Sequence, residues 1–143
     1  RMPQNWAEVI KGRINESSSK SIAWFFDFKV QNKGILLTFL EIAVNIRSYL
    51  LKRPYGDQGL LISRDLYKKI GGYSPLYIME DIDIIERITK EFNIKSLGIP
   101  IYIDGRRWKD VNVLVQAWKN ANLRKLWRNG ESSKDLAIKY YKN

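Results

Sequence analysis

Residues 22–30 read Ile-Ala-Trp-Phe-Phe-Asp-Phe-Lys-Val, a run of aromatic and branched apolar side chains. Such a composition predicts a buried strand. Asp27 and Lys29 are the charged residues in the run, so the strand is expected to become half-exposed there. This stretch therefore indicates a fold that contains a sheet.

Helices are predicted on either side of this strand in the sequence. Residues 35–51 carry apolar side chains at helical spacing, which predicts a long and mostly buried helix. Residues 110–128 form a second long pattern, which is amphipathic. Its core-facing residues are expected to be Val111, Leu114, Val115 and Trp118. Shorter helices are predicted at residues 6–14, 65–70 and 81–92 and after the polar break at 129–130.

Short apolar stretches between these helices predict further strands. They lie at residues 60–62, 95–97 and 99–103, and Gly98 and Pro100 are expected to break the last two apart. Helices that alternate with short apolar strands favour an α/β layered fold. The length of 143 residues favours one domain over 1–143, with a core at 1–109 and C-terminal helices at 110–143.

The overall composition limits the chemistry. A net charge of +10 points to an anionic partner, which could be nucleic acid, a phosphorylated small molecule or an acidic membrane surface. The chain has no Cys and no His, which excludes disulfides, thiolate metal sites and Ser–His–Asp catalysis within it. Any metal would be bound through oxygen ligands, which favours Mg²⁺ or Mn²⁺. Because no run reaches the roughly 18 apolar residues that span a bilayer, a cytoplasmic location is expected.

The first candidate site is the acidic pair Glu80 and Asp81, at a predicted junction between a loop and a helix. Carboxylates at a helix N-terminus can simply cap free N–H groups and interact with the helix dipole. A carboxylate held rigidly at such a junction can also act as a general base toward a ligand hydroxyl. The two roles are compatible, since one carboxylate can cap while its neighbour catalyses.

The second candidate site is the segment Gly56-Asp57-Gln58, which is followed by Gly59. It can be a tight turn in which the glycines supply positive φ and Asp57 bonds to its own backbone. Alternatively, Asp57 and Gln58 are fixed polar groups that recognise the hydroxyls of a sugar.

The third candidate site is Arg106-Arg107-Trp108. It can be a solvated basic turn before a helix. Alternatively, the two guanidinium groups bind phosphate oxygens with paired hydrogen bonds and neutralise a diphosphate leaving group. Trp108 would then pack the loop or stack on a ring.

The order of these motifs resembles that of the small bacterial family 2 glycosyltransferases. The pattern runs Tyr-Gly-Asp-Gln-Gly at 55–59, Ile-Gly-Gly-Tyr at 70–73, Met-Glu-Asp at 79–81 and Arg-Arg-Trp at 106–108. It is most similar to the subgroup named transferase 2, rSAM/selenodomain-associated. The resemblance covers nearly the whole chain, and residues 1–6 look like the segment that follows the family's D-x-D motif.

The resemblance implies a partial GT-A fold: a mixed sheet with flanking helices that lacks the N-terminal nucleotide-binding half. It implies inverting sugar transfer from a nucleotide-sugar donor to an unknown acceptor hydroxyl. Asp81 or Glu80 would be the base, with Asp81 preferred; Gly56, Asp57 and Gln58 would lie on the acceptor side, and Arg106, Arg107 and Trp108 near the diphosphate. Mg²⁺ or Mn²⁺ is expected for the full-length enzyme, but the family's D-x-D metal motif belongs to the missing half. The chain, which begins at Arg1, is therefore expected to be a fragment that is inactive alone.

Other readings remain open beside this one. Basic and aromatic residues alternate in 118–128, which suits a nucleic-acid-binding module or peripheral contact with an anionic membrane. The simpler interpretation is an amphipathic helix with solvated Lys and Arg. A half-domain would also leave apolar strands such as 22–28 uncovered, which predicts self-association through the exposed sheet.

Overall fold

Two parallel strands form the centre of the structure, a computed structural model that describes residues 1–15, 21–31, 34–104 and 112–142. Strand β1 (Ile22–Val30) pairs with β2 (Asn93–Ile103) from Ile22 opposite Asn93 to Val30 opposite Ile103. The register shifts between Phe25 and Asp27, where β2 contains Gly98 and Pro100. The two strand pieces predicted at 95–97 and 99–103 are thus one strand with an irregular register, so the prediction of a break was wrong.

Strand β1 is covered on both faces. Ile22, Trp24 and Phe26 cluster with Leu97 and with Ile10 of α1 (Trp6–Ile14). Between them, Ala23 and Phe25 point the other way, as alternation along a strand requires, and pack against α3 (Arg64–Lys69) and α4 (Glu80–Glu91). The expectation that the faces of this strand would lie uncovered was therefore wrong. Self-association through the edges of the sheet stays a prediction.

The strand predicted at residues 60–62 is reduced to one antiparallel bridge. The Trp24 N–H donates to the Leu61 carbonyl and the Leu61 N–H donates to the Trp24 carbonyl, both at 2.8 Å. The described residues thus confirm an α/β class, with a two-stranded parallel sheet, a bridge on its flank and surrounding helices.

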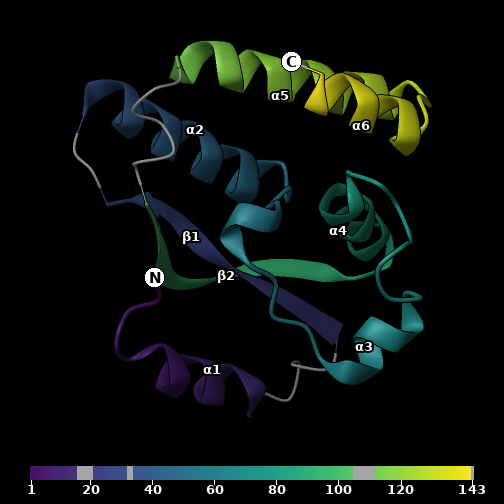
Figure 1. Ribbon diagram of the computed structural model, residues 1–143. Helices are drawn as coiled ribbons and strands as arrows, with labels where there is room; N and C mark the ends of the chain where they lie inside the picture. The colour runs from purple at the N-terminus through teal and green to yellow at the C-terminus, as the bar shows by residue number, and fades with distance from the viewer. Residues whose placement is uncertain (16–20, 32–33, 105–111, 143) are drawn as a thin grey trace.

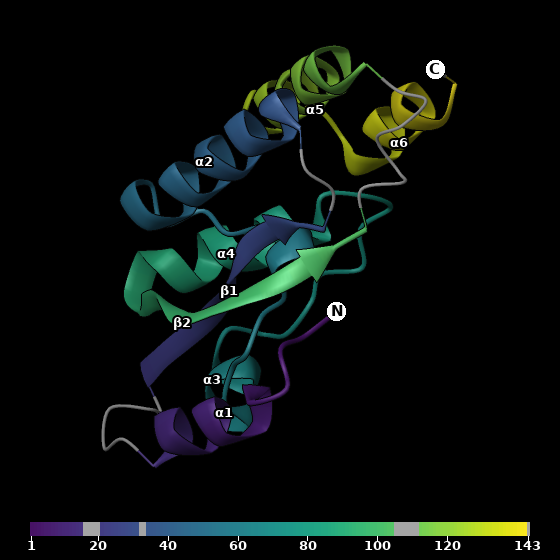
Figure 2. The same cartoon turned by 90° about the vertical axis from the view of Figure 1, so that its left-hand side faces the viewer.

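The helices lie on two sides of this sheet. Figures 1 and 2 show α1 on one side and α2 (Ile35–Leu50), α5 (Val113–Arg128) and α6 (Ser133–Tyr141) on the other. None of the helices in the described ranges combines the length and the apolar content needed to cross a membrane.

Both long helices bury less than their patterns predicted. In α2 only Val44 and Ser48 are buried, so the expectation of a mostly buried helix was wrong. In α5 the buried residues are Val113 and Leu123. The residues expected to face the core, Leu114, Val115 and Trp118, are exposed, while Val111 lies outside the described residues.

Local sequence explains where several helices begin and end. Ser63 accepts the Leu66 N–H at the start of α3, and Asn112 and Ser132 cap α5 and α6 in the same way. The predicted stop of α3 at Gly71-Gly72 is confirmed, because both glycines have a positive φ, of 80° and 66°. The loop between α2 and α3 contains a short 3₁₀ turn, η2 (Gly56–Gln58).

Candidate functional site

The two carboxylates of the acidic pair, at the N-terminus of α4, differ in their exposure to solvent. Glu80 is exposed, whereas Asp81 is half-buried and turns toward η2. One Asp81 carboxylate oxygen, Oδ2, accepts the Gly56 N–H at 2.7 Å, and the other, Oδ1, accepts the Ile82 N–H at 2.8 Å. Asp81 thus makes a contact of the capping type and at the same time joins two of the three predicted clusters.

The residue before the pair has an unusual backbone. Met79 is at φ 71°, in the left-handed region that side chains other than Gly rarely adopt, and it makes no side-chain cap. Such a conformation is unfavourable by about 1–2 kcal/mol and is maintained by the surrounding structure. The direction in which α4 presents its first carboxylates is therefore fixed by the fold.

Gly56 brings the turn close to Asp81. A Cβ atom at this position would lie 3.2 Å from Asp81 Oδ2, which is tighter than an ordinary contact. A larger residue would push the turn and the carboxylate apart. Gly56 thus serves the close approach of backbone and carboxylate, and the positive φ expected of the glycines in this segment occurs at Gly59, at 62°.

Gln58 lies in the interior with 0% of its surface exposed. Its Oε1 accepts from Ser48 Oγ at 2.6 Å and its Nε2 donates to the Phe26 carbonyl at 3.2 Å. The expectation that Gln58 contacts the hydroxyls of a ligand does not fit this burial. The side chain instead fixes the turn to α2 and β1.

Asp57 is open to solvent but is crowded by protein atoms on the side that faces the fold. This crowding raises the pKa of Asp57 above its ordinary value. Arg47 opposes the rise, the nearby Asp81 carboxylate adds to it, and Arg124 opposes it more weakly. Two carboxylates and two guanidinium groups therefore lie within electrostatic reach of one another at an accessible surface.

Tyr55 is the centre of this basic group. The Arg47 guanidinium lies 4.3 Å from the centre of its ring and the Arg124 guanidinium lies 5.7 Å from it. Arg128 donates to the Tyr55 hydroxyl at 3.0 Å. Burial lowers the pKa of both Arg47 and Arg124, although arginine stays charged at such sites. The arginines thus hold α2, η2 and α5 together around the candidate site.

Sequence reasoning missed these arginines. The available signal was Arg47, the one basic residue in the apolar segment 35–50. Arg124 had no such signal, because it is surrounded by other basic residues and reads as part of a solvated face.

A separate network fixes the Gly71-Gly72-Tyr73 segment to α4. Arg87 donates to the Asp83 carboxylate at 2.7 and 3.0 Å, to the Gly72 carbonyl at 2.6 Å and to the Ile70 carbonyl. The Tyr73 side chain is exposed over about half of its surface. The pKa of its hydroxyl is raised, mainly by partial burial and further by the charges of Asp81, Tyr67 and Glu80. The Tyr73 hydroxyl therefore lies within electrostatic reach of the two carboxylates.

The spacing of Asp81 and Asp83 formally matches D-x-D, the pattern of a metal-binding pair. Residues two apart on a helix point to different sides, however, and Asp83 is engaged by Arg87 and by Ser74 Oγ at 2.6 Å. Within the described ranges, no group of three or more acidic side chains is placed to share a metal ion. These residues do not fit the metal that the resemblance implies.

The third predicted cluster, Arg106, Arg107 and Trp108, lies outside the described residues. Two of the hollows among the described residues are lined by neither Asp57 nor Asp81. One of about 620 Å³ lies where β1 and β2 end, lined by residues that include Lys29, Glu41 and Tyr102. The other, of about 450 Å³, lies between α5 and α6.

Comparison of the chain with protein-family models, with curated proteins and with solved structures finds no match.

Proposed function

We propose that this chain is the acceptor-side half of an inverting glycosyltransferase with a GT-A fold, and that Asp81 is its general base. The observation that carries the proposal is the 2.7 Å hydrogen bond from the Gly56 N–H to Asp81 Oδ2. This bond brings Asp81 against the Gly-Asp-Gln turn, so that two of the three motifs behind the resemblance lie together. The α/β arrangement is compatible with the proposal.

In the proposed reaction, a hydroxyl of the acceptor attacks the anomeric carbon of a nucleotide-sugar. A C–O bond forms on one face of the sugar while the bond to the diphosphate breaks on the other, which inverts the configuration. The hydroxyl proton passes to a carboxylate oxygen of Asp81, and the bonding electrons leave with the nucleoside diphosphate. A positioned base typically contributes about 10²- to 10⁴-fold to the rate.

Several described residues would support this base without touching the reacting atoms. Gln58 and Gly56 hold the turn, and the Met79 backbone aims the start of α4. Arg47 and Arg124 place positive charge near Asp57 and Asp81. Arg106 and Arg107 keep their proposed role as the diphosphate clamp.

Tyr73 extends the acceptor side of the proposal. Its ring is exposed and its hydroxyl lies within electrostatic reach of Asp81 and Glu80, and we propose that it stacks on the apolar face of the acceptor sugar. Asp57, which is open to solvent, is the polar group of the turn that remains available to an acceptor hydroxyl.

The metal that the resemblance implies would be held outside the described residues. Transfer is accordingly expected of a longer polypeptide that adds a D-x-D motif and a nucleotide-binding half to these 143 residues. The chain alone is expected to be inactive.

A donor screen tests the proposal. The chain, alone and extended at its N-terminus along its natural reading frame, is incubated with a panel of nucleotide-sugars, Mg²⁺ or Mn²⁺ and simple glycoside acceptors. The release of nucleoside diphosphate is measured. We expect release by the extended polypeptide with at least one donor, and the lack of release with every donor and acceptor would count against the assignment.

A further inference from the structure

The outer face of α2 is apolar along its whole length. This α2 outer face consists of side chains spaced three or four residues apart, and Ile35 at 78%, Phe39 at 65% and Leu50 at 74% are among the most exposed. The opposite side of the helix packs on β1 through Val44. Because apolar side chains of α2 already pack on β1, the exposed apolar side chains form a second apolar face that has no cover among the described residues. The α2 outer face comprises Ile35, Leu36, Phe39, Ile42, Ile46 and Leu50.

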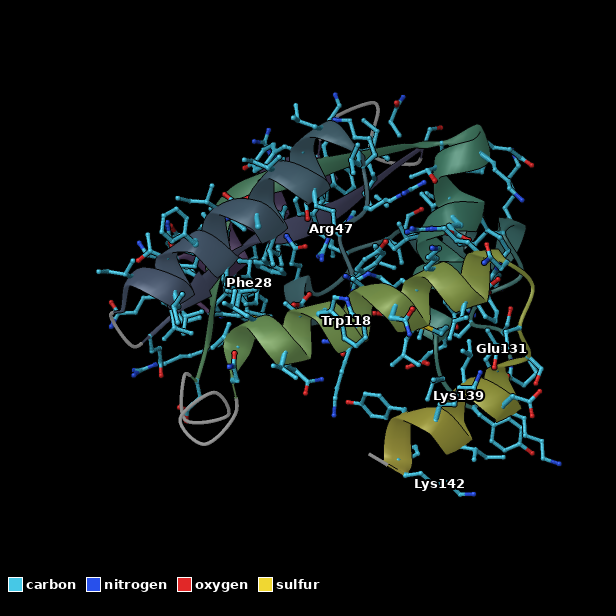
Figure 3. The ribbon with its side chains drawn as sticks, turned by 90° about the horizontal axis from the view of Figure 1, so that it is seen from above. Phe28, Arg47, Trp118, Glu131, Lys139 and Lys142 are labelled. Carbon is cyan, nitrogen blue, oxygen red and sulfur yellow. The ribbon has the colours of Figure 1, made fainter. Side chains whose placement is uncertain are left out.

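The start of α5 adds to the same surface. Leu114, Val115 and Trp118 are exposed, Trp118 by 68%. The first turns of α2 and α5 lie at the same end of the molecule in Figures 1 and 2, and the view from above shows both helices on the near side (Figure 3). Apolar side chains of two helices thus gather on one side of the protein, opposite α1.

The charges at this surface have one sign. Helix α5 carries no acidic residue. Arg124 and Arg128 are held at Tyr55, whereas Lys125 is exposed. The acidic residue of α2, Glu41, turns inward, where its Oε1 accepts the Val30 N–H at 2.6 Å. Lys52 follows the helix and is exposed. The surface is therefore apolar and cationic together.

This combination favours an anionic membrane surface over other occupants. A helix that lies in a membrane interface buries an apolar face while basic residues contact anionic headgroups, and Trp is enriched at that depth. A second copy of the chain would bring another +10 charge against the same surface. Nucleic acid would meet mainly aliphatic side chains, which offer little stacking to bases.

We propose that the α2 outer face, with Trp118 of α5 beside it, docks the protein in the plane of an anionic lipid bilayer. The inference stands on exposure and charge and does not depend on the proposed glycosyl transfer. Docking in this orientation would place α1 away from the lipid.

Vesicle sedimentation of the full chain tests this docking. The vesicles are phosphatidylcholine alone or phosphatidylcholine mixed with phosphatidylserine. We expect at least about tenfold more binding to the anionic vesicles, since each basic residue near such a surface strengthens binding. The double variant Phe39→Ser/Ile46→Ser is expected to lose at least about tenfold of it. Both side chains are exposed, so the fold should survive, which circular dichroism verifies.

The matched control is Ile14→Ser, which removes an exposed apolar side chain from α1 on the other side of the sheet. This variant is expected to bind like the wild type. Equal binding by the wild type and the α2 double variant would overturn the proposal, as would indifference to lipid charge. Two other results would also overturn the proposal. One is light scattering that shows a dimer in the wild type and a monomer in the double variant. The other is random-sequence DNA that binds the wild type and the double variant equally and displaces the vesicles.

Discussion

Gln58 connects three parts of the chain through one buried amide, which reaches α2, β1 and the turn that carries Asp57. Replacing Gln58 with Leu leaves the Phe26 carbonyl without its partner in the interior. We expect the free energy of unfolding to fall by about 2 kcal/mol, the usual effect of an unsatisfied buried polar group. Urea unfolding measures this change in the free energy of unfolding. The control is Gln31→Leu, at an exposed position, which is expected to change the free energy of unfolding by less than about 0.5 kcal/mol.

Asp83 gives stability a defined pH dependence. Burial alone would raise its pKa, but hydrogen bonds from Ser74 and Arg87 and the charge of Arg87 lower it below the ordinary value of 3.8. A lowered folded-state pKa stabilises the protein above pH 3.8, and this stability is lost as the pH falls through the folded value. We expect Asp83→Asn to reduce the free energy of unfolding by about 1–2 kcal/mol at neutral pH.

The difference between the wild type and Asp83→Asn should then shrink as the pH falls below 4, because protonation of the wild-type carboxylate removes the same interaction. Urea unfolding at a series of pH values measures this difference. A constant difference down to pH 2 would contradict the assigned hydrogen bonds.

At the scale of elements, the position of α5 depends on Tyr55. The helix buries only two of its residues, whereas Arg124 and Arg128 hold it to the Tyr55 ring and hydroxyl. We expect Tyr55→Leu to speed amide hydrogen exchange in α5 while α4 stays protected. Tyr55→Phe keeps the ring and should retain most of the protection. Equal exchange in the wild type and the Leu variant would show that other contacts hold the helix.

Helical spacing predicted the existence of α2 and α5 correctly but not which side of each is covered. In α2, apolar residues occur on nearly every side, so the pattern predicted burial and could not show that the outer side lacks a neighbour. In α5, Trp118 and Leu114 formed the apolar stripe, yet the helix turns Arg124 inward to meet Tyr55. Contacts between distant parts of the chain, which no local pattern contains, decide such orientations.

The candidate site was predictable where its contacts follow from local structure. The start of α4 at Glu80-Asp81 and the tight turn at 56–58 are local features. The bond that joins them links residues 25 positions apart, so no local pattern contains it. The burial of Gln58 was not predictable, since it depends on Ser48 and Phe26, which belong to other elements, 10 and 32 residues away in the sequence. The expected clamp at Arg106-Arg107 stays a prediction.

At the scale of the whole molecule, Phe25 tests whether the chain unfolds as one domain. Its side chain is 1% exposed in a cluster shared by β1, β2, α3 and α4. We expect Phe25→Ala to lower the free energy of unfolding by about 3–5 kcal/mol. Far-ultraviolet circular dichroism and tryptophan fluorescence should report one coincident transition in the wild type. Separate transitions would mean that the C-terminal helices unfold independently.

The most direct test of the proposed function is the rate of sugar transfer by an Asp81→Asn variant of the extended polypeptide, measured beside the wild type and the exposed control Asp65→Asn. We predict that Asp81→Asn lowers the rate of transfer by at least about 10²-fold and leaves the affinity for the nucleotide-sugar nearly intact. The control Asp65→Asn is expected to transfer at the wild-type rate. Turnover by Asp81→Asn at the wild-type rate would contradict the account.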